Sequence, residues 1–160
     1  MTVQILPGFD RPDQVRELFN EYTDLIIEGD SGFREYLAIQ NFDEEILHLE
    51  HKYGPPGGRL YLAYCDQRLA GCIALRQLDE TRCEMKRLYV RSAFRHNHIG
   101  SILVDRLIAD AKAIGYQELL LDTFPFLDTA IRMYQKRGFY EIPKYNDSPM
   151  ESTIYMKLDL

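Results

Sequence analysis

The sequence predicts an α+β fold in which helices pack around one mixed β-sheet. Three observations predict it. The chain has 160 residues, which at about 100–200 residues per domain fits a single domain over residues 1–160. Helical periodicity fills the first third, and strand-like runs dominate after the loop at residues 53–58. The predicted order is β-α-α-β-β-β-α-β-α-β-β, which lacks the repeated βαβ unit of a dinucleotide-binding protein.

The first third of the chain reads as one short strand followed by helices. Pro12 is tolerated in the first turn of a helix, and Asp43 is expected to cap another. Gly29 and Gly32 flank a break between the first two helices. The expected elements are a strand over residues 3–6 and helices over 12–28, 33–39 and 43–52.

The remainder of the chain alternates strands with two helices. Asp66-Gln67 joins two strand-like runs as a hairpin turn, and Gly115 is placed to end a long amphipathic helix. A shorter helix carries Ala130 and Tyr134 and ends at Gly138. The expected strands cover residues 59–65, 69–77, 82–90, 118–123, 139–142 and 153–158, and the long helix covers 99–114.

Composition excludes several classes of protein. Hydrophobic residues make up 46% and charged residues 28%, which is ordinary for a globular protein and excludes disordered, collagen-like and coiled-coil chains. The net charge of −6 argues against nucleic-acid binding, which needs a basic footprint. No apolar run approaches about 18 residues and no signal peptide is seen, so we expect no membrane association and a cytoplasmic location. The three cysteines form no CxxC pair and are expected to be small buried side chains.

One stretch has the layout of an anion site. The strand over residues 84–90 leads through a turn rich in cationic side chains into the long helix. The first N–H groups of a helix have no internal partner and favour negative charge. Arg95, His96 and His98 add positive or titratable groups, and Gly100 permits close approach to the backbone. The alternative is a basic surface loop that caps a core helix.

Two motifs give the chain a family resemblance. The segment Arg95-x-x-His98-x-Gly100 resembles the Arg/Gln-x-x-Gly-x-Gly/Ala signature of the GCN5-related N-acetyltransferase (GNAT) family. Residues 130–139 resemble that family's Ala-x-x-x-Tyr-x-x-x-Gly-Phe segment. The resemblance covers residues 59–142 best and implies a GNAT-like three-layer sandwich, with helices flanking a central mixed, mostly antiparallel sheet. It also implies an N-acetyltransferase that uses acetyl-CoA and no metal.

The resemblance further implies where the coenzyme binds. The pantetheine arm would pair with strand backbone as an added strand, and the pyrophosphate would bind the turn that follows. The resemblance also implies the mechanism: a primary amine of a small molecule or protein would attack the thioester directly in a ternary complex. Family members often form homodimers. The implied coenzyme-binding residues are Leu88, Tyr89, Val90, Arg95, His96, Asn97, His98, Ile99, Gly100 and Ser101.

The chain departs from the family pattern at two positions. His98 stands where the first signature glycine is expected, and a positive φ there would strain a side chain, although His tolerates it better than most. An imidazole could instead face the pyrophosphate. Leu127 stands where many members have Asn, so Asp128 or Thr129 would have to supply that polar contact.

Two residues are expected to carry proton transfer. Tyr134 matches the family tyrosine, whose phenol can donate to a departing thiolate; the alternative is an aromatic core residue. Glu84 is the candidate general base, and by strand alternation it should share a face with Lys86, Leu88 and Val90. The alternative for Glu84 is an ion pair with Lys86 or an arginine. The N–H of Val90 is the expected oxyanion donor.

Two further features admit simpler interpretations. His48 and His51, with Glu45 nearby, have metal-like spacing but lack a convincing third ligand, so we expect a solvated helix face and no metal. The polar segment 145–149 is expected either to line the acceptor pocket with Phe33 and Tyr36 or to be an ordinary turn.

Two functions compete at this point. The first is acetyl transfer to an amine, and the second is a coenzyme-A-binding regulatory protein of the same fold with little or no turnover. His98 and Leu127 favour the regulator, whereas Tyr134 and Glu84 favour the enzyme. The sequence does not identify the acceptor amine or show whether acetyl is the only acyl group transferred.

Overall fold

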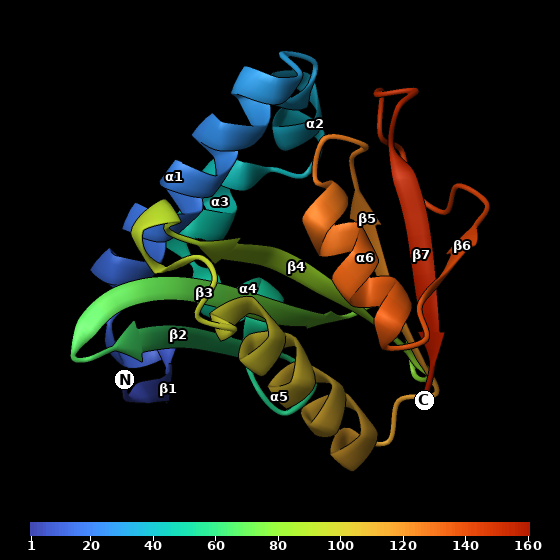
Figure 1. The fold of residues 1–160 in the computed structure, drawn as a ribbon. Helices are drawn as coiled ribbons and strands as arrows, with labels where there is room; N and C mark the ends of the chain where they lie inside the picture. Colours follow the sequence, from blue (N-terminus) through green and yellow to red (C-terminus); the bar gives the residue numbers. More distant parts are fainter.

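Seven strands form one sheet in the computed structural model, which describes residues 1–160 (Figure 1). The sheet order is β1-β2-β3-β4-β5-β7-β6, and every neighbouring pair is antiparallel except β4 with β5. The three cysteines lie in strands, free and buried, as predicted. The strands are β1 (Val3–Pro7), β2 (Arg59–Cys65), β3 (Arg68–Gln77), β4 (Arg82–Val90), β5 (Glu118–Thr123), β6 (Tyr140–Ile142) and β7 (Ile154–Asp159).

Helices cover both faces of this sheet, which confirms the predicted three-layer sandwich. One hydrophobic cluster lies under α1 to α4, and a second lies under α5 and α6 (Figure 1). None of the helices combines the length and apolar character that crossing a bilayer requires. The helices are α1 (Pro12–Gly29), α2 (Phe33–Ile39), α3 (Phe42–Leu47), α4 (Leu49–Tyr53), α5 (Ile99–Ile114) and α6 (Asp128–Lys136), with 3-10 turns η1 (Gly8–Asp10) and η2 (Ser92–Phe94).

Local turn chemistry accounts for several boundaries. Gly115 ends α5 with a φ of +108°, a left-handed conformation that glycine adopts without steric cost. Asp66 and Gln67 both have positive φ, as the tight hairpin between β2 and β3 requires. Both features agree with the predictions from sequence.

The predicted helix over residues 43–52 is wrong in two respects. Asn41, with a φ of +57°, occupies the N-cap position of α3, so Asp43 lies within the first turn and caps nothing. The helix is also interrupted at His48, whose φ of −133° is not helical, so α3 and α4 are separate. This break lets α3 direct Glu45 toward the sheet.

A β-bulge interrupts β4. Cys72 of β3 lies opposite Tyr89, but Ala74 lies opposite Lys86, so β4 contains one extra residue in this interval. Arg87 lies within it and has a φ of +61°. The bulge shifts the alternation of the side chains that follow.

Because of this shift, part of the predicted face is wrong. Leu88 and Val90 pack against the same hydrophobic cluster as Met85, beneath α5, rather than on the face that carries Glu84. Tyr89 packs against the opposite cluster, beneath α1.

The parallel pair β4 and β5 separates after a short ladder. Only three residue pairs are in register, and the last joins Glu84 to Leu120. Beyond Glu84 the two strands diverge, which leaves the β5-facing edge of β4 without a strand partner (Figure 1).

Candidate functional site

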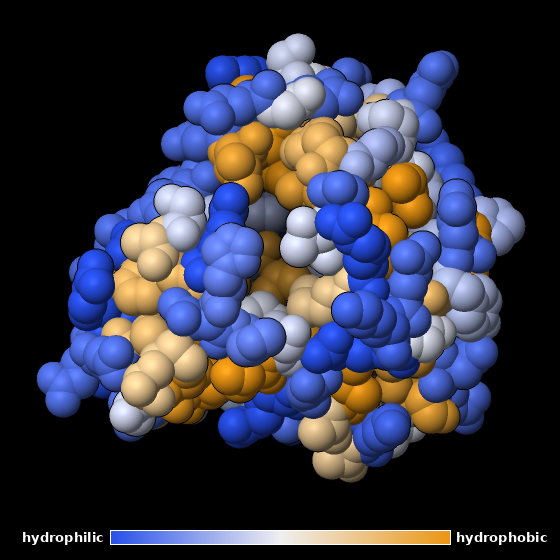
Figure 2. Space-filling model, in the orientation of Figure 1, coloured by the Kyte–Doolittle hydropathy of each residue, from blue (hydrophilic) through white to orange (hydrophobic).

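A cleft of about 1000 Å³ opens where β4 and β5 diverge. Its walls come from β4, the turn before α5, β5, α6 and the end of α1. The space-filling view shows a hollow with hydrophobic residues inside it and along its upper edge, and hydrophilic side chains on its left and right (Figure 2). The cleft therefore joins a polar entrance to an apolar interior.

The turn before α5 lines one end of this cleft. Six of the seven coenzyme-binding residues predicted in this turn line the cleft: Arg95, His96, His98, Ile99, Gly100 and Ser101. The seventh, Asn97, does not line it. The backbone N–H groups of Ile99, Gly100 and Ser101 donate to no acceptor within the protein. Three free donors at the start of a 16-residue helix suit an anion.

The backbone at His98 has the positive φ that would strain a side chain. His98 has a φ of +60° and occupies the N-cap position of α5, and His96 also has a positive φ, of +70°. A Cβ at Gly100 would meet only ordinary contacts, the nearest at 3.8 Å. The missing side chain at Gly100 thus leaves room above the helix terminus rather than relieving a clash.

Helix α6 adds cationic side chains that the sequence analysis did not single out. Arg132, Lys136 and Arg137 line the same cleft as Arg95. Arg137 is held by Asp105, with 2.7 Å between Nε and Oδ1. Their signal in the sequence was the spacing of basic residues along a helix beside the predicted turn. Despite the net negative charge of the chain, this end of the cleft is basic.

The open edge of β4 forms another wall. Leu88, Tyr89 and Val90 all line the cleft, and that they bind the coenzyme stays a prediction. The Tyr89 hydroxyl instead faces α1, where it donates to Glu21 at 3.2 Å. Tyr89 therefore presents its backbone rather than its phenol for an added strand.

Tyr134 lies in the wall opposite β4. It is 6% exposed, lines the cleft, and packs its ring 5.6 Å from that of Phe139. Its hydroxyl makes no hydrogen bond within the protein. Burial raises the pKa of Tyr134 above its usual value, so the phenol keeps its proton at neutral pH. Leu127, Asp128 and Thr129 at the start of α6 also line the cleft.

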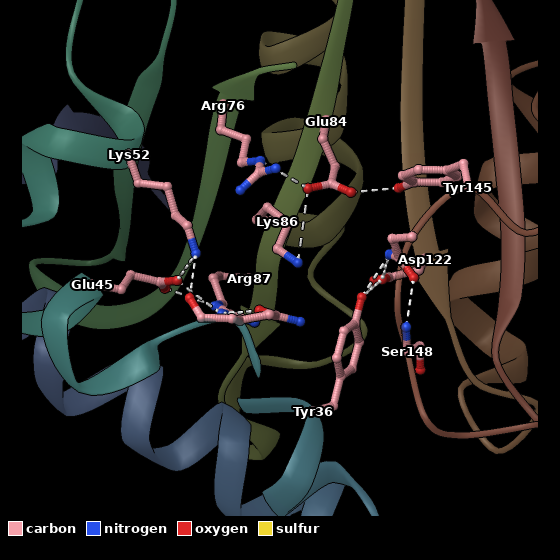
Figure 3. Close-up of polar contacts among 12 residues, drawn as sticks. Tyr36, Glu45, Lys52, Arg76, Glu84, Lys86, Arg87, Asp122, Tyr145 and Ser148 are labelled. Carbon is pink, nitrogen blue, oxygen red and sulfur yellow. Dashed lines mark hydrogen bonds and ion pairs between the residues drawn. The ribbon is translucent and has the colours of Figure 1, made fainter. Parts of the chain in front are cut away.

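Glu84 is buried and does not line the cleft. Its Oε1 lies 3.2 Å from Arg76 Nε and 3.9 Å from Lys86 Nζ, and its Oε2 accepts a hydrogen bond from Tyr145 (Figure 3). Both carboxylate oxygens are therefore engaged, and a proton could reach Glu84 only through one of these neighbours.

A second carboxylate, that of Asp122 on β5, does line the cleft. Tyr36 of α2 donates to its Oδ2, as does Asn146 at 2.8 Å. Burial by itself raises the pKa of Asp122, but the charge of Lys86 and these two hydrogen bonds outweigh burial and lower the pKa. Its only signal in the sequence is that of an acidic residue after three consecutive leucines in a predicted strand.

The predicted acceptor segment over residues 145–149 joins this polar network. Asn146 Oδ1 accepts hydrogen bonds from the Tyr155 hydroxyl and from the Ser148 N–H. Tyr36 lies beside Asn146, with 2.6 Å between its hydroxyl oxygen and Asn146 Nδ2, whereas Phe33 packs in the core and does not line the cleft. The loop is therefore held against Asp122 by Asn146, but none of residues 145–149 lines the cleft, and neither does Tyr36.

One exposed cluster has the ligand types of a metal site. His48, Glu50 and His51 place their ligand atoms within 4.8 Å of one another. His51 Nδ1 lies 2.9 Å from Glu44 Oε1, whereas Glu45 turns inward, away from this cluster. The arrangement matches the solvated helix face expected from the sequence, and the absence of a metal stays a prediction.

Comparisons with known proteins agree with this geometry. Residues 13–139 match the model of the acetyltransferase (GNAT) family. A protein of Dictyostelium discoideum described as an uncharacterized N-acetyltransferase is 33% identical, and the match covers 100% of each chain. One of Schizosaccharomyces pombe, described in the same way, is 36% identical over 78% of this chain and 77% of its own.

A solved structure extends the likeness to the whole fold. The PaiA N-acetyltransferase of Thermoplasma acidophilum, crystallised in complex with coenzyme A, superposes with a TM-score of 0.75. The match covers 100% of both chains at 20% sequence identity, so it shows a common fold.

Proposed function

Because the chain belongs to the acetyltransferase (GNAT) family, we propose that it transfers the acetyl group of acetyl-CoA to a primary amine. The acceptor is a small molecule or a protein, and the amine attacks the thioester directly in a ternary complex. One observation carries the proposal: a single cleft contains the three free N–H groups at the start of α5, the open edge of β4 and the unpartnered hydroxyl of Tyr134.

The residues present fit the coenzyme. The N–H groups of Ile99, Gly100 and Ser101 supply donors for a diphosphate, and Arg95 supplies positive charge beside them. The edge of β4 over residues 88–90 supplies backbone groups for the amides of pantetheine. Coenzyme A in the Thermoplasma relative supports this assignment by analogy of fold.

Tyr134 is proposed as the general acid. The amine nitrogen forms a bond to the thioester carbonyl carbon, the C–S bond breaks, and the departing sulfur receives the phenolic proton. A protonated phenol with no competing hydrogen bond is available for this transfer. The N–H of Val90 is proposed to donate to the carbonyl oxygen as negative charge develops on it.

Glu84 is proposed to accept the proton lost by the amine. Glu84 does not line the cleft and accepts a hydrogen bond from the Tyr145 hydroxyl, so the proton would reach it through this phenol rather than move directly. Positioning of the amine against the thioester supplies much of the rate, so a relayed base is compatible with turnover.

The competing proposal is a coenzyme-A-binding regulator with little turnover, favoured by His98 and Leu127. Steady-state release of thiol from acetyl-CoA, measured against a panel of amines, separates the two. Amine-dependent release supports the enzyme. Tight binding of acetyl-CoA with no amine-dependent release would support the regulator. A cytoplasmic location, a homodimer and a single domain over residues 1–160 stay predictions.

A further inference from the structure

Two oppositely charged groups in the cleft each have an atom without a hydrogen-bond partner in the protein. They are the ammonium of Lys86 on β4 and Oδ1 of Asp122 on β5, and both residues line the cleft. Figure 3 shows them facing the gap between the two strands. Because both groups line the cleft, a ligand in the cleft can reach these two atoms.

The ammonium of Lys86 is buried and poorly satisfied. Its side chain is 6% exposed, and the sole carboxylate oxygen within 4.0 Å is Glu84 Oε1, at 3.9 Å. The face of the Tyr36 ring, 5.9 Å from Nζ to the centroid, is its other neighbour. Glu84 is already paired with Arg76 and accepts from Tyr145. A buried ammonium without a hydrogen bond is costly, and an anionic group entering the cleft would remove that cost.

The carboxylate of Asp122 has one oxygen that accepts no hydrogen bond within the protein. Tyr36 and Asn146 both donate to Oδ2, and no group of the protein donates to Oδ1. The two hydrogen bonds fix the carboxylate plane, and Lys86 keeps it ionised. Oδ1 is therefore an oriented acceptor for an amine N–H on a bound ligand.

The charges of the network indicate the ligand's own charges. Lys86 and Asp122 line the cleft with one charge of each sign, and Arg87, which also lines it, is paired with Glu45, so this part of the cleft is balanced. A ligand with one positive and one negative group keeps the balance, whereas a simple amine adds an uncompensated cation beside Lys86. Tyr22, Leu25 and Phe126 line the same cleft and offer apolar surface to a ligand bound there.

We propose that the acceptor is a small amino acid-like molecule whose amine binds Asp122 Oδ1 and whose carboxylate binds Lys86, with an apolar side chain against Tyr22, Leu25 and Phe126. This inference rests on the proposed acetyl transfer and names the substrate class of the same site. It assigns binding and orientation to Lys86 and Asp122, and adds no step to the chemistry.

Matched acceptors test the proposal. L-phenylalanine and phenethylamine share ring and amine and differ in the carboxylate, as do L-leucine and 3-methylbutylamine. With acetyl-CoA saturating, kcat/KM from thiol release should be at least about tenfold higher for each amino acid, since a charge-assisted hydrogen bond is lost without the carboxylate. Equal values within each pair, or higher values for the simple amines, would overturn the inference.

Variants at Lys86 add a second readout. Lys86→Met should bring the ratio of kcat/KM between L-phenylalanine and phenethylamine close to one, and Lys86→Arg should restore part of it. Lys112→Met, which removes an exposed lysine in the last turn of α5, is the control and should keep the full ratio. A ratio unchanged in Lys86→Met would overturn the inference.

The failure of this inference and of the proposed function are distinguishable. Calorimetric binding of acetyl-CoA reports whether each variant is folded and competent. Binding without thiol release for any amine would count against acetyl transfer itself. If the rate of thiol release is the same for acceptors with and without a carboxylate, only the assignment of Lys86 and Asp122 fails.

Discussion

Arg87, at the bulge of β4, donates hydrogen bonds to both carboxylate oxygens of Glu45 on α3, at 2.9 Å from Nε and 3.0 Å from Nη2. Their side chains are 2% and 1% exposed. This ion pair links α3 to the bulge of β4. Beyond the bulge, Leu88 and Val90 pack on the α5 side of the sheet. The breaks around α3, at Asn41 and His48, are what allow Glu45 to reach inward.

This pair predicts a specific pH dependence of stability. Burial by itself raises the pKa of Glu45, but Arg87 and Lys52 outweigh it and lower the pKa from 4.5 to about 2. A lowered folded-state pKa gives stability that is present above pH 4.5 and is lost as the pH falls toward about 2. The contribution to the free energy of unfolding is about 3 kcal/mol.

Urea unfolding between pH 2 and pH 6 measures it. Glu45→Gln should be less stable at pH 6 and should lose less stability on acidification than the unsubstituted chain. Glu44→Gln, a neighbouring exposed position, is the control and should follow the original profile. Parallel pH profiles for Glu45→Gln and the original chain would contradict the assignment.

Tyr134→Phe should lower kcat by about a hundredfold or more and leave the dissociation constant of acetyl-CoA within about twofold, because only the donated proton is lost. Steady-state thiol release measures kcat, and isothermal calorimetry measures the dissociation constant. An unchanged kcat would remove Tyr134 from the role of general acid and leave it as a core aromatic residue.

His98→Gly should be tolerated and should not weaken coenzyme binding, because glycine adopts the positive φ at this position without strain. The free energy of unfolding should rise by up to about 1 kcal/mol. Thermal melting and calorimetric titration with acetyl-CoA are the measurements. A large loss of affinity would instead identify the imidazole as a ligand of the diphosphate.

Glu84→Gln distinguishes a relayed base from an ion pair. As a base, Glu84 should support kcat/KM, so the substitution should lower it about a hundredfold. As a partner of Arg76 and Lys86 alone, it should affect the melting temperature and leave kcat/KM near its original value. The second pattern would refute the proposed catalytic role.

Much of the fold could be predicted from local signals. The positions of Gly115 and Asp66-Gln67 depend on backbone conformations that few residues favour, and the bounds of β2, β4, α2 and β5 agree with the sequence patterns. The turn before α5 was likewise predicted because its basic residues and the helix start are adjacent in the chain.

The bulge in β4 and the place of Asp122 beside Tyr36 and Asn146 could not be predicted. Arg87 has a positive φ at the bulge, and its side chain binds Glu45, 42 residues away in the sequence; no local pattern carries that information. Tyr36, Asp122 and Asn146 meet only after three distant segments pack together. Strand alternation, assumed to run unbroken through β4, therefore placed Leu88 and Val90 on the wrong face.

A crystal structure with acetyl-CoA bound tests the central claim most directly. The account predicts the diphosphate on the N–H groups of Ile99 to Ser101, the pantetheine along residues 88–90 of β4, and the sulfur within hydrogen-bonding reach of the Tyr134 hydroxyl. A bound coenzyme that leaves the turn at Arg95 empty, or that places its sulfur far from Tyr134, would contradict it.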